Sequence, residues 1–412
     1  MKVLLGTQYY YPRSLGGTER YVLDLGLELK YLNIDVAILK VGHEPDYYYD
    51  GIKVFVIPYI IGNGEKINNF KEFNEVLDIF QPDIFHLNTL HPHLNGNHIK
   101  YAKKRGIKCF FTAHLPNVTC PKGDLLLNNE IQCEGYVTPR KCLNCMLISN
   151  NKRGNIITDI VLAISILSKV KIKSSAIDAI IYTRIQKQLL ADNSTKMFVQ
   201  SDWQKKVLIQ NGFKNEHIKL IKLSISDSYL AFKKEVSKIY DICFIGRFSE
   251  EKGLSVLLRA LQTVNTNLKI CIILSIVDKD KPDIEKLVKE NHKHQFDLHY
   301  NISKEAIINK LDESKILVIP SVFVETGPYV LLEAFSRDVP VIGSNIGGMK
   351  DMIKNGKNGY LFELRNINEL AEKIMLLVSQ IENKTFKFKI NTTILSSQGY
   401  AHKIIETYKN VH

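Results

Sequence analysis

Short apolar runs alternate with longer amphipathic stretches along the first half of the chain. The stretches at 18–31 and 69–80 repeat their apolar positions every three to four residues, which predicts helices. The apolar runs are four to six residues long and predict buried strands at 2–6, 35–40, 53–57, 84–87, 108–112 and 197–200. Strands that alternate with helices indicate a doubly wound, mostly parallel sheet.

The alternation lapses in a polar stretch at 222–237 and then restarts. The restarted pattern predicts strands at 240–245, 268–274 and 316–319, and helices at 253–264 and 304–313. The sequence therefore predicts an α/β fold with two Rossmann-like domains, at 1–230 and 236–397. Because ligands bind such sheets at the carboxyl ends of the strands, we expect the domains to face each other across a cleft that holds the site.

Composition and charge narrow the function classes. The 412 residues suffice for two hydrophobic cores, and 45% hydrophobic and 24% charged residues are typical of a globular protein. No secretory signal pattern is recognisable, and seven cysteines suit a reducing compartment, so we predict a cytoplasmic location. The net charge of +12 indicates anionic partners. Nucleic acid is not expected among them, because no nucleic-acid-binding module is recognisable.

Two glutamates eight residues apart, Glu325 and Glu333, carry the strongest chemical signal. Glu325 is expected in a strand-to-helix loop and Glu333 about a turn and a half into the helix. Pro328 suits the first helical position, with Thr326 or Gly327 as the cap ahead of it. An ionised carboxylate accepts two hydroxyl donors at once, which suits a diol, and free helix N–H groups favour an anion. This combination predicts a nucleotide-sugar.

This segment and its flanks resemble the E-x7-E signature of retaining glycosyltransferases with the GT-B fold, specifically glycosyltransferase family 4. The flanks are Glu-Ala-Phe at 333–335, Val-Pro-Val-Ile-Gly-Ser-Asn-Ile-Gly-Gly at 339–348 and Asn-Gly-Lys-Asn-Gly-Tyr-Leu-Phe at 355–362. Two glutamates at this spacing also occur on solvated helices, but the flanks argue against that alternative. The resemblance implies a UDP- or GDP-sugar donor, with Glu333 on the ribose and Glu325 on the sugar hydroxyls. The implied donor site also includes Gly327, Tyr329 and Val330.

Arg247 and Lys252 follow a predicted strand and precede a helix. Sugar transfer from a nucleotide requires stabilisation of a departing diphosphate, and Arg offers a planar fork and Lys a point charge for it. The resemblance implies that this pair replaces a metal ion, so no cofactor is expected for catalysis. A solvated basic loop is the alternative. Asp278-Lys-Asp280 matches the D-x-D metal motif of other glycosyltransferases, but its charged neighbours favour a solvated turn.

A glycine pair and a histidine complete the candidate site in the first domain. Gly16 and Gly17 follow the first strand and open the first long helix, whose N-terminus attracts an anion. The resemblance places this loop against the diphosphate and the reacting sugar. His114 ends a strand, near the donor sugar in the family. The family commonly has Asp after this His and this chain has Leu115, so a structural or acceptor-only role for His114 stays open.

Four cysteines lie in a segment that resembles an insertion found in family members that build bacterial surface polysaccharides. Cys142 and Cys145 have the spacing of a zinc knuckle, whereas Cys120 and Cys133, with twelve residues between them, do not form a second one. A structural zinc ion and buried reduced thiols both stay open.

An apolar stretch followed by basic residues at 156–173 predicts contact of 151–190 with a membrane surface. The basic residues of 151–190 outnumber Asp159 and Asp178, and they are Lys152, Arg153, Lys169, Lys171, Lys173, Arg184 and Lys187. The alternative is a core helix followed by a solvated basic turn. The resemblance favours a peripheral position on the inner membrane face, since relatives often extend sugars on polyprenyl-diphosphate lipids.

Together these features predict a retaining hexosyltransferase that uses a UDP- or GDP-sugar and a glycan or polyprenyl-diphosphate-linked acceptor in polysaccharide biosynthesis. The resemblance also implies that a C-terminal helix at 398–412 returns to the first domain. Two alternatives are a nucleotide-sugar epimerase of similar fold and a non-catalytic nucleotide-sugar-binding protein. The epimerase has no signal of its own here, and the binding protein would not need the cation pair.

Overall fold

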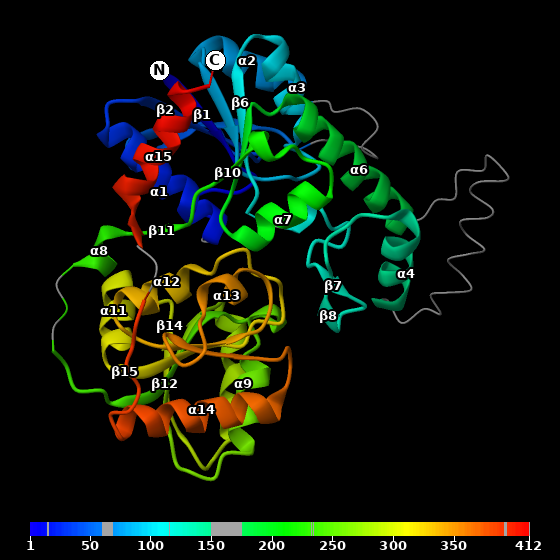
Figure 1. The fold of residues 1–412 in the computed structure, drawn as a ribbon. Coiled ribbons are helices and arrows are strands. Elements are labelled where there is room, and N and C mark those ends of the chain that lie inside the picture. Colours follow the sequence, from blue (N-terminus) through cyan, green and yellow to red (C-terminus); the bar gives the residue numbers. More distant parts are fainter. Residues whose placement is uncertain are drawn as a thin grey trace. The chain divides into compact units, whose positions relative to one another are not determined.

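The computed structural model of the protein describes residues 1–14, 16–59, 69–114, 116–149, 175–231, 233, 235–390 and 394–411. The chain divides into a first unit, Met1–Lys222 with Ser397–His412, and a second unit, Leu223–Ser396. In each unit, helices cover a mainly parallel sheet (Figure 1). The first unit ends nearer to residue 222 than to 230, because β11 (Ser224–Ile225) pairs with β18 (Leu395–Ser396) inside the second unit.

The sheet of the first unit has the strand order β10-β9-β6-β5-β1-β2-β4-β3. Its strands are β1 (Lys2–Gly6), β2 (Asp35–Val41), β3 (Tyr47–Tyr49), β4 (Ile52–Ile57), β5 (Ile84–Leu87), β6 (Lys108–Thr112), β9 (Lys196–Val199) and β10 (Ile218–Leu220). All six predicted strands are confirmed to within one residue. The sequence missed only the edge strands β3 and β10, which are three residues long and carry little periodic signal.

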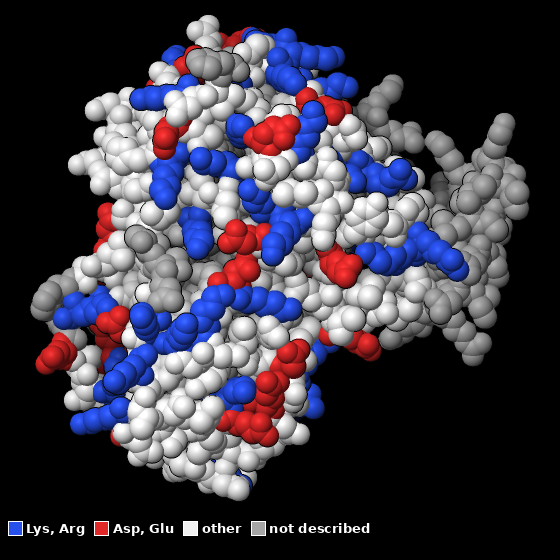
Figure 2. Space-filling view, in the orientation of Figure 1, with Lys and Arg blue, Asp and Glu red and all other residues white. Residues whose placement is uncertain are grey.

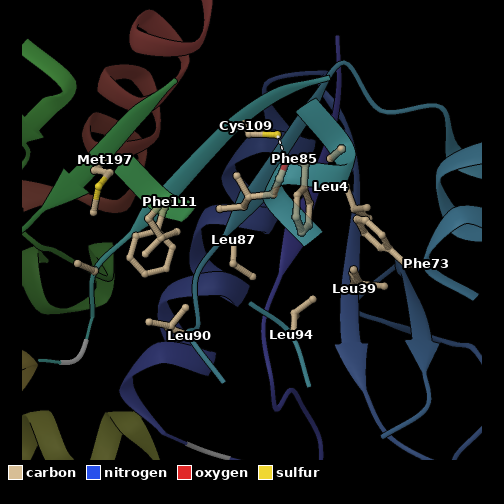
Figure 3. Packing of buried hydrophobic residues seen from close by; sticks show 14 of the residues in the cluster. Leu4, Leu39, Phe73, Phe85, Leu87, Leu90, Leu94, Cys109, Phe111 and Met197 are labelled. Atoms are coloured by element: carbon tan, nitrogen blue, oxygen red, sulfur yellow. Dashed lines mark hydrogen bonds between the residues drawn. The ribbon is translucent and has the colours of Figure 1, made fainter. Parts of the chain in front are cut away.

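The core of the first unit fills the space between its sheet and the covering helices. These are α1 (Gly17–Tyr31), α2 (Phe70–Phe80), α3 (Gly96–Lys104), α6 (Ser175–Asn193) and α7 (Asp202–Gln210). Figure 3 shows how residues from helix and sheet meet here, with Phe73 of α2 beside Phe85 of β5. The two ring centroids are 5.3 Å apart, and Leu4 and Leu39 of β1 and β2 pack into the same cluster. Burial of these apolar side chains supplies the main driving force for this unit.

The C-terminal helix α15 (Ser397–Lys409) belongs to the first unit and lies beside α1 (Figure 1). Buried hydrogen bonds hold it at both ends. The Tyr408 hydroxyl lies 2.6 Å from His86 Nδ1, and the Tyr400 hydroxyl lies 3.1 Å from the Tyr21 hydroxyl. His86 Nε2 is also 2.7 Å from the Thr112 hydroxyl at the end of β6, so the helix is tied to the middle of the sheet.

A small insertion, which we call the cysteine insertion, lies between β6 and α6, and its described part is 116–149. It contains a 3-10 turn (Pro116–Val118), the antiparallel strands β7 (Leu126–Leu127) and β8 (Ile131–Gln132), and helix α4 (Pro139–Ser149). Asn211, at the end of α7, ties the insertion to the rest of the unit. Its Nδ2 donates to the Gly135 carbonyl at 2.7 Å, and its Oδ1 accepts from the Val137 N–H at 3.2 Å.

The sheet of the second unit is wholly parallel, with the order β14-β13-β12-β15-β16-β17. Its strands are β12 (Tyr240–Arg247), β13 (Lys269–Ser275), β14 (Gln295–Tyr300), β15 (Ser314–Ile319), β16 (Val341–Ser344) and β17 (Gly359–Phe362). The helices are α8 (Asp227–Leu230), α9 (Leu254–Gln262), α10 (Lys281–Lys289), α11 (Lys304–Asp312), α12 (Tyr329–Ser336), α13 (Gly347–Met352) and α14 (Ile367–Glu382). The predicted Rossmann-like alternation of this half is confirmed.

Charged side chains are distributed over both units. Figure 2 shows Lys and Arg on each of them, with Asp and Glu among them, as the net charge of +12 leads one to expect. In the described part of the chain, no helix combines the length and apolarity needed to cross a membrane. The apolar and basic stretch at 156–173, including Lys169, Lys171 and Lys173, lies outside the described residues.

Candidate active site

The strand order of the second unit marks one place on its sheet for a ligand. From β12 the chain continues outward to β13, whereas from β15 it continues to β16 on the other side. The carboxyl ends of β12 and β15 therefore form a topological switch point, where adjacent loops diverge and leave a crevice. Arg247 is the last residue of β12, and Glu325 lies in the loop that follows β15.

Gly253 fixes the loop after β12 against the end of β15. It has a φ of +72°, which L side chains rarely adopt, and a Cβ at this position would lie 1.9 Å from the Pro320 carbonyl oxygen. The Val322 N–H donates to the Glu251 carbonyl at 2.9 Å and joins the same two loops. Only glycine permits this approach, which brings Lys252 to the loop that carries Glu325.

Lys252 and Glu325 form an ion pair at this switch point. Lys252 Nζ donates to Glu325 Oε1 at 2.6 Å, and the Ser321 hydroxyl donates to the same oxygen at 3.1 Å. The lysine side chain is 28% exposed and the glutamate side chain 13%, so solvent screens the pair only in part. Ser321 was not predicted, since nothing in its sequence context distinguishes it from other loop serines.

A glycine pair at the start of α13 packs closely against the backbone of Glu325 and Thr326. The Gly348 N–H donates to the Glu325 carbonyl at 2.7 Å. A Cβ on Gly347 would lie 2.4 Å from that carbonyl oxygen, and a Cβ on Gly348 would lie 2.2 Å from the Thr326 carbonyl oxygen. The two glycines at the end of the 339–348 flank therefore have a structural role, because the absence of a side chain lets the start of α13 contact the loop that carries Glu325.

The predicted capping of α12 is wrong by one position. The helix begins at Tyr329, and Pro328 itself is the N-cap residue, with φ −71° and ψ 127° and no side-chain cap hydrogen bond. The preceding residues do not cap the helix, because Gly347 and Gly348 hold Glu325 and Thr326 through their backbone. Tyr329 and Val330 form the first turn and are half-buried, as is Gly327.

Glu333 and Arg247 differ sharply in their surroundings. Glu333 lies within α12 and is 2% exposed, which is rare for a carboxylate and requires polar partners. Arg247 is exposed, and within the described residues its guanidinium makes no hydrogen bond or ion pair. The second unit therefore carries a buried carboxylate on α12, a paired Lys and Glu in the loops after β12 and β15, and an exposed cation at the end of β12.

In the first unit, Gly16 is the N-cap of α1 and Gly17 its first residue, as the sequence predicted. The Glu19 carboxylate lies beside Gly16, with its Oε2 only 2.2 Å from the place of a Cβ on that glycine. A side chain at Gly16 would therefore displace the Glu19 carboxylate from this position. A protein carboxylate already lies beside this helix N-terminus, which disfavours a second anion in the same place.

His114 follows β6, and Gln200 follows the neighbouring parallel strand β9. Gln200 Nε2 donates to His114 Nδ1 at 2.9 Å, which leaves the ring hydrogen on Nε2. The Tyr21 ring packs edge-on against the imidazole, with centroids 4.3 Å apart. Burial lowers the pKa of His114 to about 3, so the ring is neutral near pH 7. Gln200 orients the histidine in a chain that lacks the family's Asp, and the sequence carried no signal for it.

The D-x-D segment and the four cysteines are the two remaining sequence motifs. Asp280 Oδ2 accepts the Val277 N–H at 3.3 Å, so this carboxylate of the D-x-D segment takes part in a turn, whereas the Asp278 side chain is not described. Among the described residues, no three His, Cys, Asp or Glu side chains are grouped closely enough to hold a metal ion. Cys120, Cys133, Cys142 and Cys145 are reduced and line one small cavity.

Family models match both halves of the chain. The model described as Glycosyltransferase Family 4 matches residues 15–131, in the first unit, and the model described as Glycosyl transferases group 1 matches residues 228–391, in the second.

Curated relatives match over shorter stretches. An uncharacterized glycosyltransferase of Methanocaldococcus jannaschii is 30% identical over 34% of this chain and 38% of its own length. The amylovoran biosynthesis glycosyltransferase AmsK of Erwinia amylovora is 27% identical over 47% of this chain and 50% of its own length. The chain thus spans half or less of the length of these two relatives.

Solved structures resemble the chain over almost its full length. A sucrose-phosphate synthase from Thermosynechococcus elongatus has a TM-score of 0.67 at 15% identity, covering 99% of this chain and 98% of that one. HepE from Anabaena, in complex with UDP-glucose, has a TM-score of 0.61 at 14% identity, covering 99% of both chains. At these identities the likeness establishes the fold, and the family models establish the family. The chain therefore belongs to the group 1 glycosyltransferases and has their two-domain GT-B fold.

Proposed function

We propose that the chain is a retaining glycosyltransferase that moves a hexose-type sugar from a UDP- or GDP-sugar to a glycan or lipid-linked glycan acceptor in polysaccharide biosynthesis. The observation that carries this proposal is the Lys252–Glu325 pair, at 2.6 Å, beside the exposed Arg247 at the switch point of the second sheet. Family membership supports transfer from an activated sugar. The UDP-glucose complex of HepE supports the donor class, and the name of AmsK supports the polysaccharide context.

Each donor-binding role follows from the chemistry of one side chain. The Arg247 fork and the Lys252 ammonium take the diphosphate, because fixed cations stabilise the charge that develops on the leaving group. Lys252 thereby gains an anionic partner, and the Glu325 carboxylate turns its lone pairs to the sugar hydroxyls. Glu333, 2% exposed within α12, accepts the ribose diol, and Gly327, Tyr329 and Val330 line the same site.

Transfer proceeds on one face of the donor sugar. The acceptor hydroxyl oxygen bonds to the anomeric carbon as the bond from that carbon to the diphosphate oxygen breaks, and the hydroxyl proton passes to the leaving phosphate. No protein base is needed for this step, and the two cations take the role that a metal ion has in other glycosyltransferases. Gly16 and Gly17, at the start of α1, are the donor-binding residues that we propose in the first unit. His114, neutral and with its hydrogen on Nε2, donates a hydrogen bond to a sugar oxygen rather than a proton.

The acceptor half of the proposal places the chain at the inner membrane face. Its support is the apolar and basic stretch at 151–190 and the net charge of +12, which favour anionic lipid. Flotation with liposomes tests this. Binding should require acidic lipid, decrease with salt and weaken when Lys169, Lys171 and Lys173 are changed to Glu. A chain that remains in the soluble fraction under all conditions contradicts membrane contact.

The transfer proposal is tested by incubating the protein with a panel of UDP- and GDP-sugars. Slow hydrolysis of one donor, with the free sugar released in the anomeric configuration of that donor, is the expected result. NMR of the early product reports this configuration before mutarotation. Lys252→Ala, prepared identically, should hydrolyse the donor at least about 100-fold more slowly. Inversion of configuration contradicts the retaining mechanism, an epimerised nucleotide-sugar points to the epimerase alternative, and binding without hydrolysis points to a non-catalytic protein.

A further inference from the structure

The cysteine insertion has very little hydrophobic core of its own. Its strands β7 and β8 are two residues long each, and its helix α4 contributes only Leu143 to a cluster of three buried residues, the others being Ala176 and Ile180 of α6. A two-stranded hairpin is marginal in water, and small modules without a core usually rely on a disulfide or a metal ion. The insertion also buries Leu125, Leu126 and Val137, and a metal ion would add to this small core.

Four thiols gather around one cavity inside this insertion. Cys120 precedes β7, Cys133 directly follows β8, and Cys142 and Cys145 lie on α4. The last two are three residues apart in the helix and share one face of it. All four line a cavity of about 20 Å³, and all are reduced. Their sequence separation of up to 25 positions means that the tertiary fold, not local spacing, brings them together.

The backbone around the thiols donates hydrogen bonds to sulfur. The Asn128 N–H donates to Cys145 Sγ at 3.2 Å, and the Gly135 N–H donates to Cys133 Sγ at 3.5 Å. The Gly123 N–H closes a turn onto the Cys120 carbonyl at 3.0 Å. Asn128, Gly135 and Gly123 all have positive φ, at 54°, 79° and 87°. Turns of this kind aim amides at a thiolate, and such second-sphere hydrogen bonds are typical of metal-bound ligands.

The volume of the cavity and the charge of its lining indicate which metal it can bind. A cavity volume of about 20 Å³ holds one ion of about the size of a water molecule, and it is too small for an iron–sulfur cluster. A set of four thiolates favours zinc, bound tetrahedrally. Zinc with four thiolates carries a net charge of −2, and Lys141 lines the same cavity and offsets part of it, whereas Lys122, which also lines it, is paired with Asp124 at 3.1 Å. With four protein ligands and no open position, such a site is structural rather than catalytic.

We propose that Cys120, Cys133, Cys142 and Cys145 bind one zinc ion that holds the hairpin β7–β8 against α4. In the described rotamers no three metal-binding side chains are grouped closely enough to hold an ion, so the thiols turn into the cavity on binding. A rotation of Cys145 exchanges two weak sulfur contacts, with the Leu126 carbonyl at 3.5 Å and the Asn128 N–H at 3.2 Å, for a bond to the metal. The proposal is independent of the proposed transfer reaction.

The test measures metal in the full-length protein, purified without a polyhistidine tag or chelators. Elemental analysis and native mass spectrometry should find about one zinc per chain. The double variant Cys142→Ser, Cys145→Ser should lose it. The double variant Cys243→Ala, Cys271→Ala is the control, because it removes the same number of cysteines from the second unit and should keep the zinc.

A second measurement keeps the proposal testable if the serine variant fails to fold. Titration of the wild type with an organomercurial should release zinc as the thiols are blocked. Amide hydrogen exchange should then accelerate in β7, β8 and α4 and stay unchanged in the sheet of the second unit. Zinc-free wild type with seven titratable thiols overturns the proposal in favour of buried reduced cysteines. Fewer than seven thiols indicates a disulfide, and bound iron with sulfide indicates a cluster; either result also overturns it.

Discussion

Replacement of Gly253 by alanine is the sharpest single test of how the second unit builds its site. Gly253 combines a φ of +72° with a contact in which a Cβ would lie 1.9 Å from the Pro320 carbonyl oxygen. Gly356, in the same unit, has a φ of +71°, but its nearest neighbour, the Tyr360 hydroxyl, would be 3.8 Å from a Cβ. The two substitutions share the backbone cost and differ in the clash, so Gly356→Ala is a matched control.

The magnitudes follow from these two terms. A left-handed conformation at a non-glycine residue costs about 1–2 kcal/mol, which is the expected loss of stability for Gly356→Ala. In Gly253→Ala, the carbonyl of Pro320 or the new methyl group must move by roughly 1 Å, and overpacking of this kind adds about 1–3 kcal/mol. We therefore expect Gly253→Ala to lose about 2–5 kcal/mol in the free energy of unfolding. The same displacement shifts Lys252, and a misplacement of about 1 Å can lower the rate of catalysis by about 100-fold.

Urea unfolding followed by circular dichroism, together with donor hydrolysis, measures both effects. Because the two units can unfold separately, hydrogen exchange in β12 and β15 should locate the loss of stability in the second sheet. Gly356→Ala should keep its hydrolysis rate. If the two variants lose the same stability, or if Gly253→Ala hydrolyses the donor at the wild-type rate, then the contact with Pro320 does not position Lys252.

Three further predictions concern the candidate site and the first unit. Lys252→Ala should slow transfer by about 10²–10³-fold, because a preorganised positive charge is lost. EDTA should leave the wild type fully active. Loss of activity in EDTA that Mn²⁺ restores would contradict metal independence. Glu333→Gln should weaken binding of the free nucleoside diphosphate, whereas Glu325→Gln should spare that binding and slow transfer; calorimetry that gives one affinity for both variants and the wild type would refute the two roles. His86 and His98 are 0% exposed, and burial lowers the pKa of each to about 3. In the unfolded chain these histidines take up protons near pH 6.5, whereas in the folded chain they do not. The free energy of unfolding should therefore fall by up to about 1.4 kcal/mol per pH unit for each histidine as the pH drops from 6.5 towards 4. A free energy of unfolding that does not change over this range would contradict their burial.

The local pattern of the sequence predicted the fold class because strand and helix leave different periodicities. Runs such as 84–87 and 108–112 match β5 and β6 residue for residue. The short edge strands β3 and β10 escaped prediction, because three residues are too few for a period to emerge. The cap of α12 was misplaced for another reason. Gly348, more than twenty positions away, donates to the Glu325 carbonyl and packs closely on the Thr326 carbonyl, and no local rule for helix starts contains these contacts.

By itself, the sequence determined the family, the doubly wound architecture and the types of side chain at the candidate site, because residue identity and spacing encode these directly. Only the tertiary structure decided which of these side chains contact each other. It paired Lys252 with Glu325 and added Ser321, oriented His114 through Gln200, and gathered four cysteines around one cavity. The physical reason is that parallel strands bring their carboxyl ends together from distant parts of the chain, so side chains that are far apart in sequence become neighbours only when the sheet forms.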